Sequence, residues 1–167
     1  MHVLSFGWLG MHGMAYANKA VDEADVIVAV GMRFDDRATG MVSTFARNAR
    51  VVHIDIDPAE IGKNVKVSVP IVGDIKNILL ELNKLISSGN HMRWINQLDR
   101  WREDHPALEI RNCDELIPQY VIRQIYHATD GDAIIVTGVG QNQMWAAQYY
   151  YYNKPNRFIS SGGLGTM

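Results

Sequence analysis

The sequence contains little cysteine, no long apolar run and no excess of charge of one sign. Its single cysteine, Cys113, excludes an intramolecular disulfide and a cysteine-rich zinc site, and favours a reducing compartment. No apolar run reaches the roughly 18 residues that would span a bilayer, and the first residues lack the pattern of a secretory signal. The 16 basic and 18 acidic residues nearly balance, so charge indicates neither a nucleic-acid nor a membrane partner.

The chain nevertheless has enough apolar material for a packed core, because 47% of its 167 residues are hydrophobic and 20% are charged. The six histidines show no ligand-like spacing such as H-x-x-x-H, so we expect no metal site built from this chain alone. Cys113 lies beside Asp114 and Glu115, which disfavour its thiolate, and it is therefore not expected to be a nucleophile.

Short apolar runs alternate with helical patterns along the chain, and this order predicts an α/β fold. The run after Asp25 is almost entirely β-branched, which is typical of a parallel strand buried on both faces. We expect strands at 25–31, 51–57, 65–72, 133–137 and 157–160, and helices at 13–24, 75–86, 118–131 and 141–149.

Residues 89–114 differ in composition from their surroundings, and we interpret them as a connector with one polar helix. The part that follows has too few strands to close a sheet of its own. The sequence ends in a glycine-rich stretch at 161–167, and we therefore expect it to be a piece of a longer chain.

Two glycine pairs lie where a helix is expected to begin. Gly10-Met11-His12-Gly13 offers backbone N–H groups to a phosphate, although a tight turn is the favoured interpretation of so short a signal. The stretch 138–142 offers the same groups after a later strand, but it lacks the third glycine of a dinucleotide fingerprint.

Charged residues follow the first two strands. The stretch 31–37 carries two arginines and two aspartates, which could bind a ligand at the strand's carboxyl end or simply pair with one another. Asp55 ends the second strand, where a carboxylate commonly receives ribose hydroxyls. Asp57, followed by Pro58, is expected to cap a helix, and His53 is expected to pack in the core.

The residues alone thus predict two α/β units with possible phosphate sites and no acid–base pair. The sequence has no Walker A motif, no G-x-S-x-G and no H-E-x-x-H. The tyrosine run 149–152 is interpreted as packing or interface surface. None of these features names a reaction.

Taken together, five stretches resemble the catalytic large subunits of the acetolactate synthase (acetohydroxyacid synthase) family, which are thiamine-diphosphate enzymes. The stretches are 9–13, 31–37, 53–64, 137–148 and 160–167, and they keep the family's order along nearly the whole chain. The strings at 33–37 and 140–145 favour this family over glyoxylate carboligase or another FAD-containing thiamine-diphosphate carboligase.

The resemblance implies two parts of a larger architecture of parallel-sheet, three-layer units. Residues 1–88 correspond to the later part of a central FAD-binding domain, 89–115 to a connector, and 116–167 to the N-terminal part of a thiamine-diphosphate-binding domain. The implied cofactors are FAD, thiamine diphosphate and Mg²⁺, of which the last two also require parts that this chain lacks.

The resemblance implies that the whole protein is a transferase of branched-chain amino-acid biosynthesis. It decarboxylates pyruvate on thiamine diphosphate and condenses the product with a second 2-keto acid. The family acts as a homodimer or higher oligomer, sometimes with a regulatory subunit, in the cytoplasm or in an organelle of a eukaryote. We expect the present chain to be inactive alone, since the activating glutamate and the magnesium-binding stretch lie in other parts of the family's sequence.

The resemblance also assigns residues by position. Arg37, with Asp36, faces the carboxylate of the acceptor keto acid, and a charge-assisted bond makes that role reasonable. Asn142 stands where the family usually has histidine, and Met32 where it often has valine; no catalytic or metal-binding residue is expected. The implied cofactor contacts are Leu9, Gly10, Met11, His12, Gly31, Met32, Arg33, Phe34, Asp35, Asp55, Asp74 and Ile75 for FAD, and Gln141, Asn142, Gly165, Thr166 and Met167 for thiamine diphosphate.

One alternative belongs to a different class of protein. A domain of this kind could be a non-catalytic nucleotide-binding module that kept the fold and lost the chemistry. The sequence leaves open the preference for the acceptor keto acid.

Overall fold

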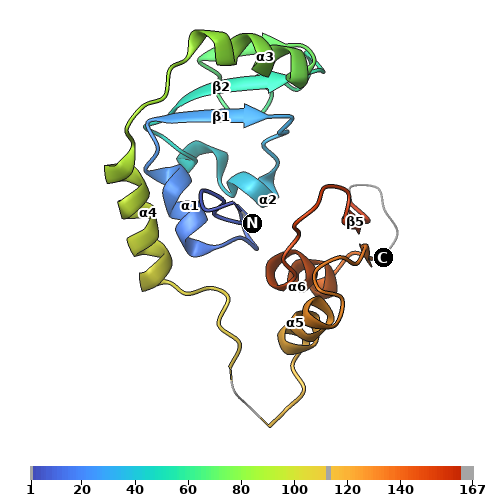
Figure 1. Cartoon of the computed structure of the whole chain (residues 1–167). Coiled ribbons are helices and arrows are strands. Elements are labelled where there is room, and N and C mark those ends of the chain that lie inside the picture. The colour runs from blue at the N-terminus through green and yellow to red at the C-terminus, as the bar shows by residue number, and fades with distance from the viewer. Residues whose placement is uncertain (1, 112–113, 163–167) are drawn as a thin grey trace. The chain divides into compact units, whose positions relative to one another are not determined.

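The computed structural model describes residues 2–111 and 114–162. Two compact units result (Figure 1): the N-terminal unit, Leu9–Asp104, and the C-terminal unit, which comprises the described parts of 1–8 and 105–167. Across the described residues, no helix combines the length and the apolar character needed to cross a membrane. Cys113 and the expected thiamine-diphosphate contacts Gly165, Thr166 and Met167 lie outside the described residues.

A parallel sheet forms the centre of the N-terminal unit. Strands β1 (Val26–Val30), β2 (Arg50–Asp55) and β3 (Val69–Val72) lie in the order β1-β2-β3. All three expected strands are thereby confirmed, although β3 begins later than expected. Pro70 lacks an N–H group and is tolerated in β3 because β3 is an edge strand.

Phe34 and His53 anchor the core on one face of this sheet. The ring of Phe34 meets the ring of His53 edge-on at 5.1 Å and that of Phe45 at 5.9 Å. Ala29 and Val51 are buried in the same cluster. His53 is fully buried, as expected, but neither of its ring nitrogens has a hydrogen-bond partner within the described residues.

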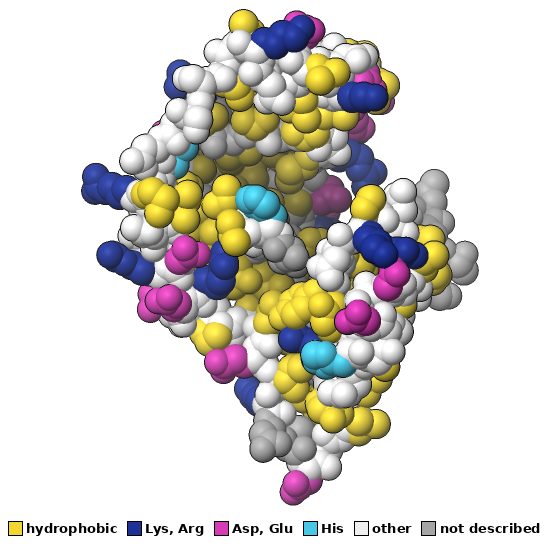
Figure 2. Space-filling view, in the orientation of Figure 1, with side chains coloured by type: hydrophobic (Ala, Val, Ile, Leu, Met, Phe, Trp, Pro, Cys, Tyr) yellow, Lys and Arg dark blue, Asp and Glu magenta, His cyan; other side chains and the backbone are white. Residues whose placement is uncertain are grey.

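The opposite face of β1 is open. Val26, Val28 and Val30 are 42%, 50% and 45% exposed, so the expected burial of this strand on both faces is wrong. Side chains of a strand alternate between its two faces, and the buried cluster lies on the face that carries Ile27 and Ala29. Figure 2 shows hydrophobic side chains on the visible surface of both units.

Helices α1 (Ala15–Asp22) and α4 (Met92–Asp104) pack against each other in the N-terminal unit (Figure 1). Leu98 of α4 is buried, and the ammonium of Lys19 lies 4.9 Å from the ring centre of Trp101, a cation–π contact. Helix α4 is the polar helix expected in the connector, and its packing makes it part of the N-terminal unit.

The sequence predicts some of the other helices of this unit and misses others. Helix α3 (Ile75–Leu85) is confirmed, whereas α2 (Asp36–Thr39) and the 3₁₀ turn η1 (Val42–Thr44) are too short to give a periodic signal. The helix expected after Asp57 is wrong. The Asp57 carboxylate does accept from the Ala59 amide at 2.9 Å, as a cap would. The chain then forms turns over 58–62, with Gly62 at a positive φ of 72°, and no helix follows.

The C-terminal unit contains a two-stranded parallel sheet and two helices. Its elements follow the expected order: α5 (Pro118–Ala128), β4 (Ile135–Thr137), α6 (Gln141–Tyr149) and β5 (Phe158–Ser160).

Tyrosines form much of the core of the C-terminal unit, which confirms their interpretation as packing residues. Tyr150 is 1% exposed, and its hydroxyl accepts from the Ala133 amide at 3.1 Å and lies 3.0 Å from the Thr129 hydroxyl. The Tyr126 ring meets it edge-on at 5.4 Å. Burial raises the pKa of the Tyr152 phenol above its usual value.

Replacing His53 with leucine tests how much its buried ring nitrogens lower the free energy of unfolding. We expect His53→Leu to raise the free energy of unfolding of the N-terminal unit by about 1 kcal/mol, because a buried polar group without a partner is destabilising. Urea unfolding followed by circular dichroism measures the change. His91→Leu, at an exposed histidine of the same unit, should leave stability nearly unchanged, and a loss of stability in His53→Leu would contradict the expectation.

Asp132 provides a test of pH dependence in the C-terminal unit. Its carboxylate lies 2.9 Å from both Lys154 and Arg157, and the hydrogen bond from Lys154 is the main cause that lowers its pKa. A lowered folded-state pKa contributes stability above the unfolded pKa, and this is lost as pH falls through the folded value.

We expect Lys154→Met to raise the pKa of Asp132, as measured by carboxyl-carbon NMR shifts during an acid titration. The matched change Lys66→Met, at an exposed lysine of the other unit, should leave that pKa unchanged. An Asp132 pKa that stays the same in Lys154→Met would show that Lys154 is not the cause.

Candidate functional site

The carboxyl ends of the three parallel strands meet at one edge of the N-terminal sheet. The Gly31 amide donates to the Ile54 carbonyl at 2.9 Å, and the Gly73 amide donates to the Asp55 carbonyl at 2.9 Å. These bonds extend the ladders of β1 with β2 and of β2 with β3 by one step. The loops after all three strands therefore start side by side. This is the edge at which open α/β sheets bind their ligands.

In the loop after β1, the buried residue Phe34 anchors the chain between two charged residues, Arg33 and Asp35. Phe34 is 3% exposed and adopts a positive φ of 51°, which turns the chain sharply into α2. Arg33 and Asp35 on either side of it lie 3.8 Å apart, and the Arg33 side chain is 66% exposed. The Asn64 side-chain amide donates to the Arg33 carbonyl at 3.0 Å, so the backbone is fixed while the guanidinium faces solvent.

Helix α2 presents the pair expected to face the keto acid. Asp35 caps this helix by accepting from the Ala38 amide at 3.1 Å. Arg37 and Asp36 lie 3.3 Å apart, with side chains that are 68% and 74% exposed. Such an exposed pair contributes little to stability, so the guanidinium can exchange this partner for a ligand carboxylate.

The loop 9–13 is a tight turn in which three of the backbone amides already donate hydrogen bonds within the protein. The amide of Gly10 donates to Asn18 Oδ1 at 2.7 Å, that of Met11 to the Arg37 carbonyl at 2.8 Å, and that of Gly13 to the Gly10 carbonyl at 2.9 Å. A phosphate cradle built from these three amides is therefore wrong, and the alternative of a turn is confirmed. Contacts to a cofactor from this loop have to come from other groups, such as the exposed Met11 side chain.

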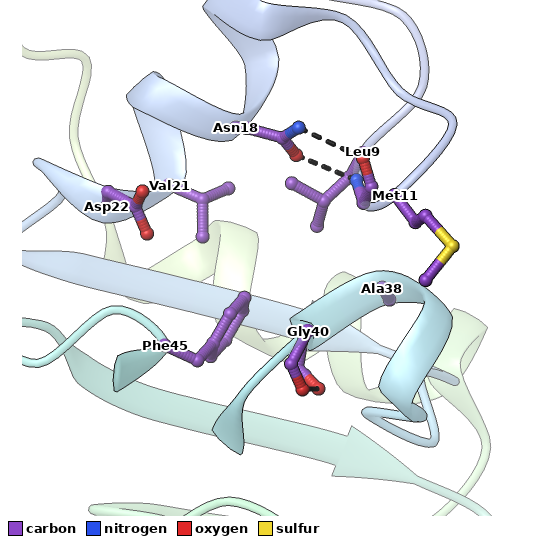
Figure 3. Close-up of a pocket in the computed structure, with 10 residues that line it drawn as sticks. Leu9, Met11, Asn18, Val21, Asp22, Ala38, Gly40 and Phe45 are labelled. Atoms are coloured by element: carbon purple, nitrogen blue, oxygen red, sulfur yellow. Dashed lines mark hydrogen bonds between the residues drawn. The ribbon is translucent and has the colours of Figure 1, made fainter. Parts of the chain in front are cut away.

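A cavity of about 310 Å³ lies beside this turn (Figure 3). The close-up shows Asn18 reaching from α1 to the turn, with Leu9 and Phe45 directed into the space between α1 and the rest of the unit. Ten residues line the cavity: Leu9, Gly10, Met11, Asn18, Val21, Asp22, Ala38, Thr39, Gly40 and Phe45.

The other expected FAD contacts lie at the ends of β2 and β3. Asp55 accepts from the Asp57 amide at 2.9 Å, and Asp74 caps α3 by accepting from the Asn77 amide at 3.0 Å. Ile75 begins α3. Each carboxylate uses one oxygen locally, and since a carboxylate has two acceptor oxygens, the other can receive a ribose hydroxyl.

In the C-terminal unit, Gln141 and Asn142 are the first two residues of α6 and are exposed. Gln143, which sequence reasoning missed, donates to the Ser160 hydroxyl at 2.5 Å and to the Ser161 carbonyl at 2.9 Å. The Ser160 hydroxyl also lies 2.8 Å from that of Thr137. This network joins the ends of β4 and β5 to the start of α6, and nothing in the sequence signalled it because its members are far apart in the chain.

The described residues fit a nucleotide better than a metal ion. An open guanidinium at Arg33 and carboxylates at Asp55 and Asp74 at one sheet edge match the phosphate and ribose of a dinucleotide such as FAD. Across the described residues, no group of three or more His, Cys, Asp or Glu lies close enough to hold a metal. Nothing in the described part is therefore assigned to Mg²⁺.

Gly10 provides a test of the contact between the turn and α2. A Cβ atom on Gly10 would collide with the Arg37 carbonyl oxygen and lie 2.8 Å from Ala38 Cα, at a φ of +98°. We expect Gly10→Ala to lower the free energy of unfolding by about 3 kcal/mol, since strain and clash add.

The matched control is Gly62→Ala, where φ is +72° and a Cβ meets no heavy atom within 4 Å. It carries only the cost of the left-handed backbone, about 1 kcal/mol. Urea unfolding of both variants measures the difference, and equal losses would show that the turn does not contact α2 as described.

Two family models match the chain. The thiamine pyrophosphate enzyme central domain matches residues 1–82, and the thiamine pyrophosphate enzyme C-terminal TPP binding domain matches residues 138–167. Helix α1 and the three parallel strands fall in the first match, and α6 with β5 in the second.

The chain is also similar to named proteins over 98% of its length. It is 50% identical to acetolactate synthase 1, chloroplastic, of Oryza sativa subsp. japonica and 48% identical to acetolactate synthase 1, chloroplastic, of Zea mays. It is 48% identical to acetolactate synthase, chloroplastic, of Arabidopsis thaliana. The chain spans only 26%, 27% and 25% of the length of these three relatives. On the two domain matches and these identities, the chain belongs to the thiamine pyrophosphate enzyme family, in which it resembles the acetolactate synthases.

Proposed function

We propose that this chain is part of the catalytic subunit of an acetolactate synthase. The observation that carries the proposal is the sequence identity of 48–50% that the chain shares, over 98% of its length, with proteins of that name. The shared sheet edge with Arg33, Asp55 and Asp74 supports it, because it matches a site for a dinucleotide. The three relatives reported above carry the acetolactate synthase name, which favours this activity over that of another carboligase.

The proposed reaction joins two 2-keto acids. Pyruvate loses CO₂, and the remaining two-carbon unit is added to the keto group of a second pyruvate or of 2-ketobutyrate. Thiamine diphosphate, when bound, supplies the electron sink for the decarboxylation. FAD is bound but takes no part in the net reaction, so its role in this proposal is structural.

Within this chain, Arg37 would bind the acceptor's carboxylate. Its side chain is open to solvent, and among the described residues its guanidinium pairs only with Asp36, at 3.3 Å. A carboxylate ligand can replace that partner and form two parallel N–H···O bonds, which fix the orientation of the keto group. Asp36 would remain its neighbour at the same site.

The flavin would lie along the edge at the ends of β1, β2 and β3. Arg33 would bind a phosphate, Asp55 and Asp74 would accept hydroxyl hydrogen bonds, and the residues of 9–12 and 31–35 would contact the rest of the molecule. In the C-terminal unit, Gln141 and Asn142 would contact thiamine diphosphate, with Gly165, Thr166 and Met167 as predicted partners.

The chain by itself is proposed to be inactive. It spans about a quarter of the length of its relatives, and no described cluster of acidic or histidine side chains holds Mg²⁺. Activity is therefore a property of the whole protein, proposed as a homodimer or higher oligomer with an optional regulatory subunit. The chloroplastic names of the relatives support an organellar location in a eukaryotic source.

Flavin binding tests the proposal without requiring turnover. We expect the chain to retain FAD after gel filtration, and we expect Arg33→Ala to weaken its affinity for FAD at least tenfold, since a charge-assisted hydrogen bond contributes about 1.5–3 kcal/mol. Flavin fluorescence titration measures the affinity.

The matched control is Arg100→Ala, at an exposed arginine on α4, which should bind FAD like the wild type. A wild-type chain that retains no flavin would argue against the flavin part of the proposal. Equal affinities in Arg33→Ala and Arg100→Ala would argue against the role of Arg33.

A further inference from the structure

The side-chain amide of Asn18, on α1, forms two hydrogen bonds with Gly10 of the turn 9–13: its oxygen accepts one and its nitrogen donates the other. The Gly10 amide donates to Asn18 Oδ1 at 2.7 Å, and Asn18 Nδ2 donates to the Gly10 carbonyl at 2.9 Å (Figure 3). This pairing uses an acceptor and a donor at a fixed separation. Aspartate would keep only the acceptor, and alanine would keep neither.

The next residue of the turn is bonded to α2. The Met11 amide donates to the Arg37 carbonyl at 2.8 Å, and Gly10 approaches the same carbonyl so closely that it has no room for a Cβ. The peptide between Gly10 and Met11 is thus held from two sides, by the Asn18 side chain and by the backbone of Arg37. The Arg37 guanidinium takes no part in this contact, and the Arg37 side chain is 68% exposed.

Apolar packing gives the turn little additional support. The cavity of about 310 Å³ lies beside it, and the Met11 side chain is 62% exposed. Hydrogen bonds therefore help to fix its position, and two of them come from the side chain of Asn18, which a point mutation can remove.

We infer that Asn18 is a positioning residue that sets the turn 9–13 for the flavin and, through the bond from Met11 to Arg37, the backbone that carries the guanidinium for the keto acid. It would act through the turn and through α2, not by binding either ligand itself. The inference rests on the proposed function, because the ligands on the two sides of the turn are those proposed above. It predicts that flavin affinity depends on a residue that does not touch the flavin.

The test compares the full wild-type chain with Asn18→Asp and Asn18→Ala. Two quantities are measured: the amide hydrogen-exchange rates of Gly10 and Met11 by NMR, and the affinity for FAD by fluorescence titration. In Asn18→Ala we expect both exchange rates to rise and FAD affinity to fall by about tenfold, as for the loss of one to two hydrogen bonds. Asn18→Asp, which keeps the acceptor for the Gly10 amide, should lie between wild type and Asn18→Ala.

Two controls separate positioning from general stability. Leu98→Ala removes a buried side chain from α4 in the same unit and should lower stability while leaving FAD affinity and the Gly10 and Met11 exchange rates near wild type under native conditions. Asn83→Ala, at an exposed asparagine of α3, should change none of these quantities.

The outcomes distinguish this inference from the proposed function. If the wild-type chain binds FAD and the Asn18 variants bind it equally well, the positioning role is overturned while the proposed function stands. If flavin affinity falls in Leu98→Ala as much as in Asn18→Ala, the effect is one of stability and the inference is again overturned. If the wild type binds no FAD, the flavin part of the proposed function fails, and unchanged Met11 exchange in Asn18→Ala would separately overturn the link to Arg37.

Discussion

Parallel pairing of β1, β2 and β3 is the constraint on which the candidate site depends. A parallel ladder brings the carboxyl ends of its strands to one edge, and the bonds from Gly31 to Ile54 and from Gly73 to Asp55 continue the ladder just past the strands. Three loops that are far apart in sequence therefore begin together. Without that register, the loops that carry Arg33 and Asp55 would not begin at the same edge of the sheet.

The site combines a buried support with open charges. Phe34 packs against His53 beneath the loop, while Arg33 and Asp35 beside it stay exposed. Burial fixes the backbone, and exposure leaves the guanidinium able to change partners, since an exposed ion pair holds it only weakly. The same division occurs in α2, where the backbone of Arg37 is bonded to the turn 9–13 and its side chain is free to reorient.

Local sequence was a sound guide where one pattern dominated. The apolar run of β1, the stripe of α3 and Pro118 at the start of α5 gave elements that the structure confirms. It failed after Asp57, where a cap bond forms but the chain continues in turns rather than in a helix. Helix α2 was missed because four residues carry no period.

The sequence by itself determined the α/β class, the order of the strands and of the longer helices, and the family to which the chain belongs. These depend on local patterns and on strings such as residues 31–37. Only the tertiary structure decided which backbone amides remain available to a ligand and which loops contact each other. It showed that the turn 9–13 uses its N–H groups on Asn18 and Arg37, and that Gln143 joins the ends of β4 and β5. Such bonds link residues distant along the chain, and their existence depends on packing geometry that no local pattern encodes.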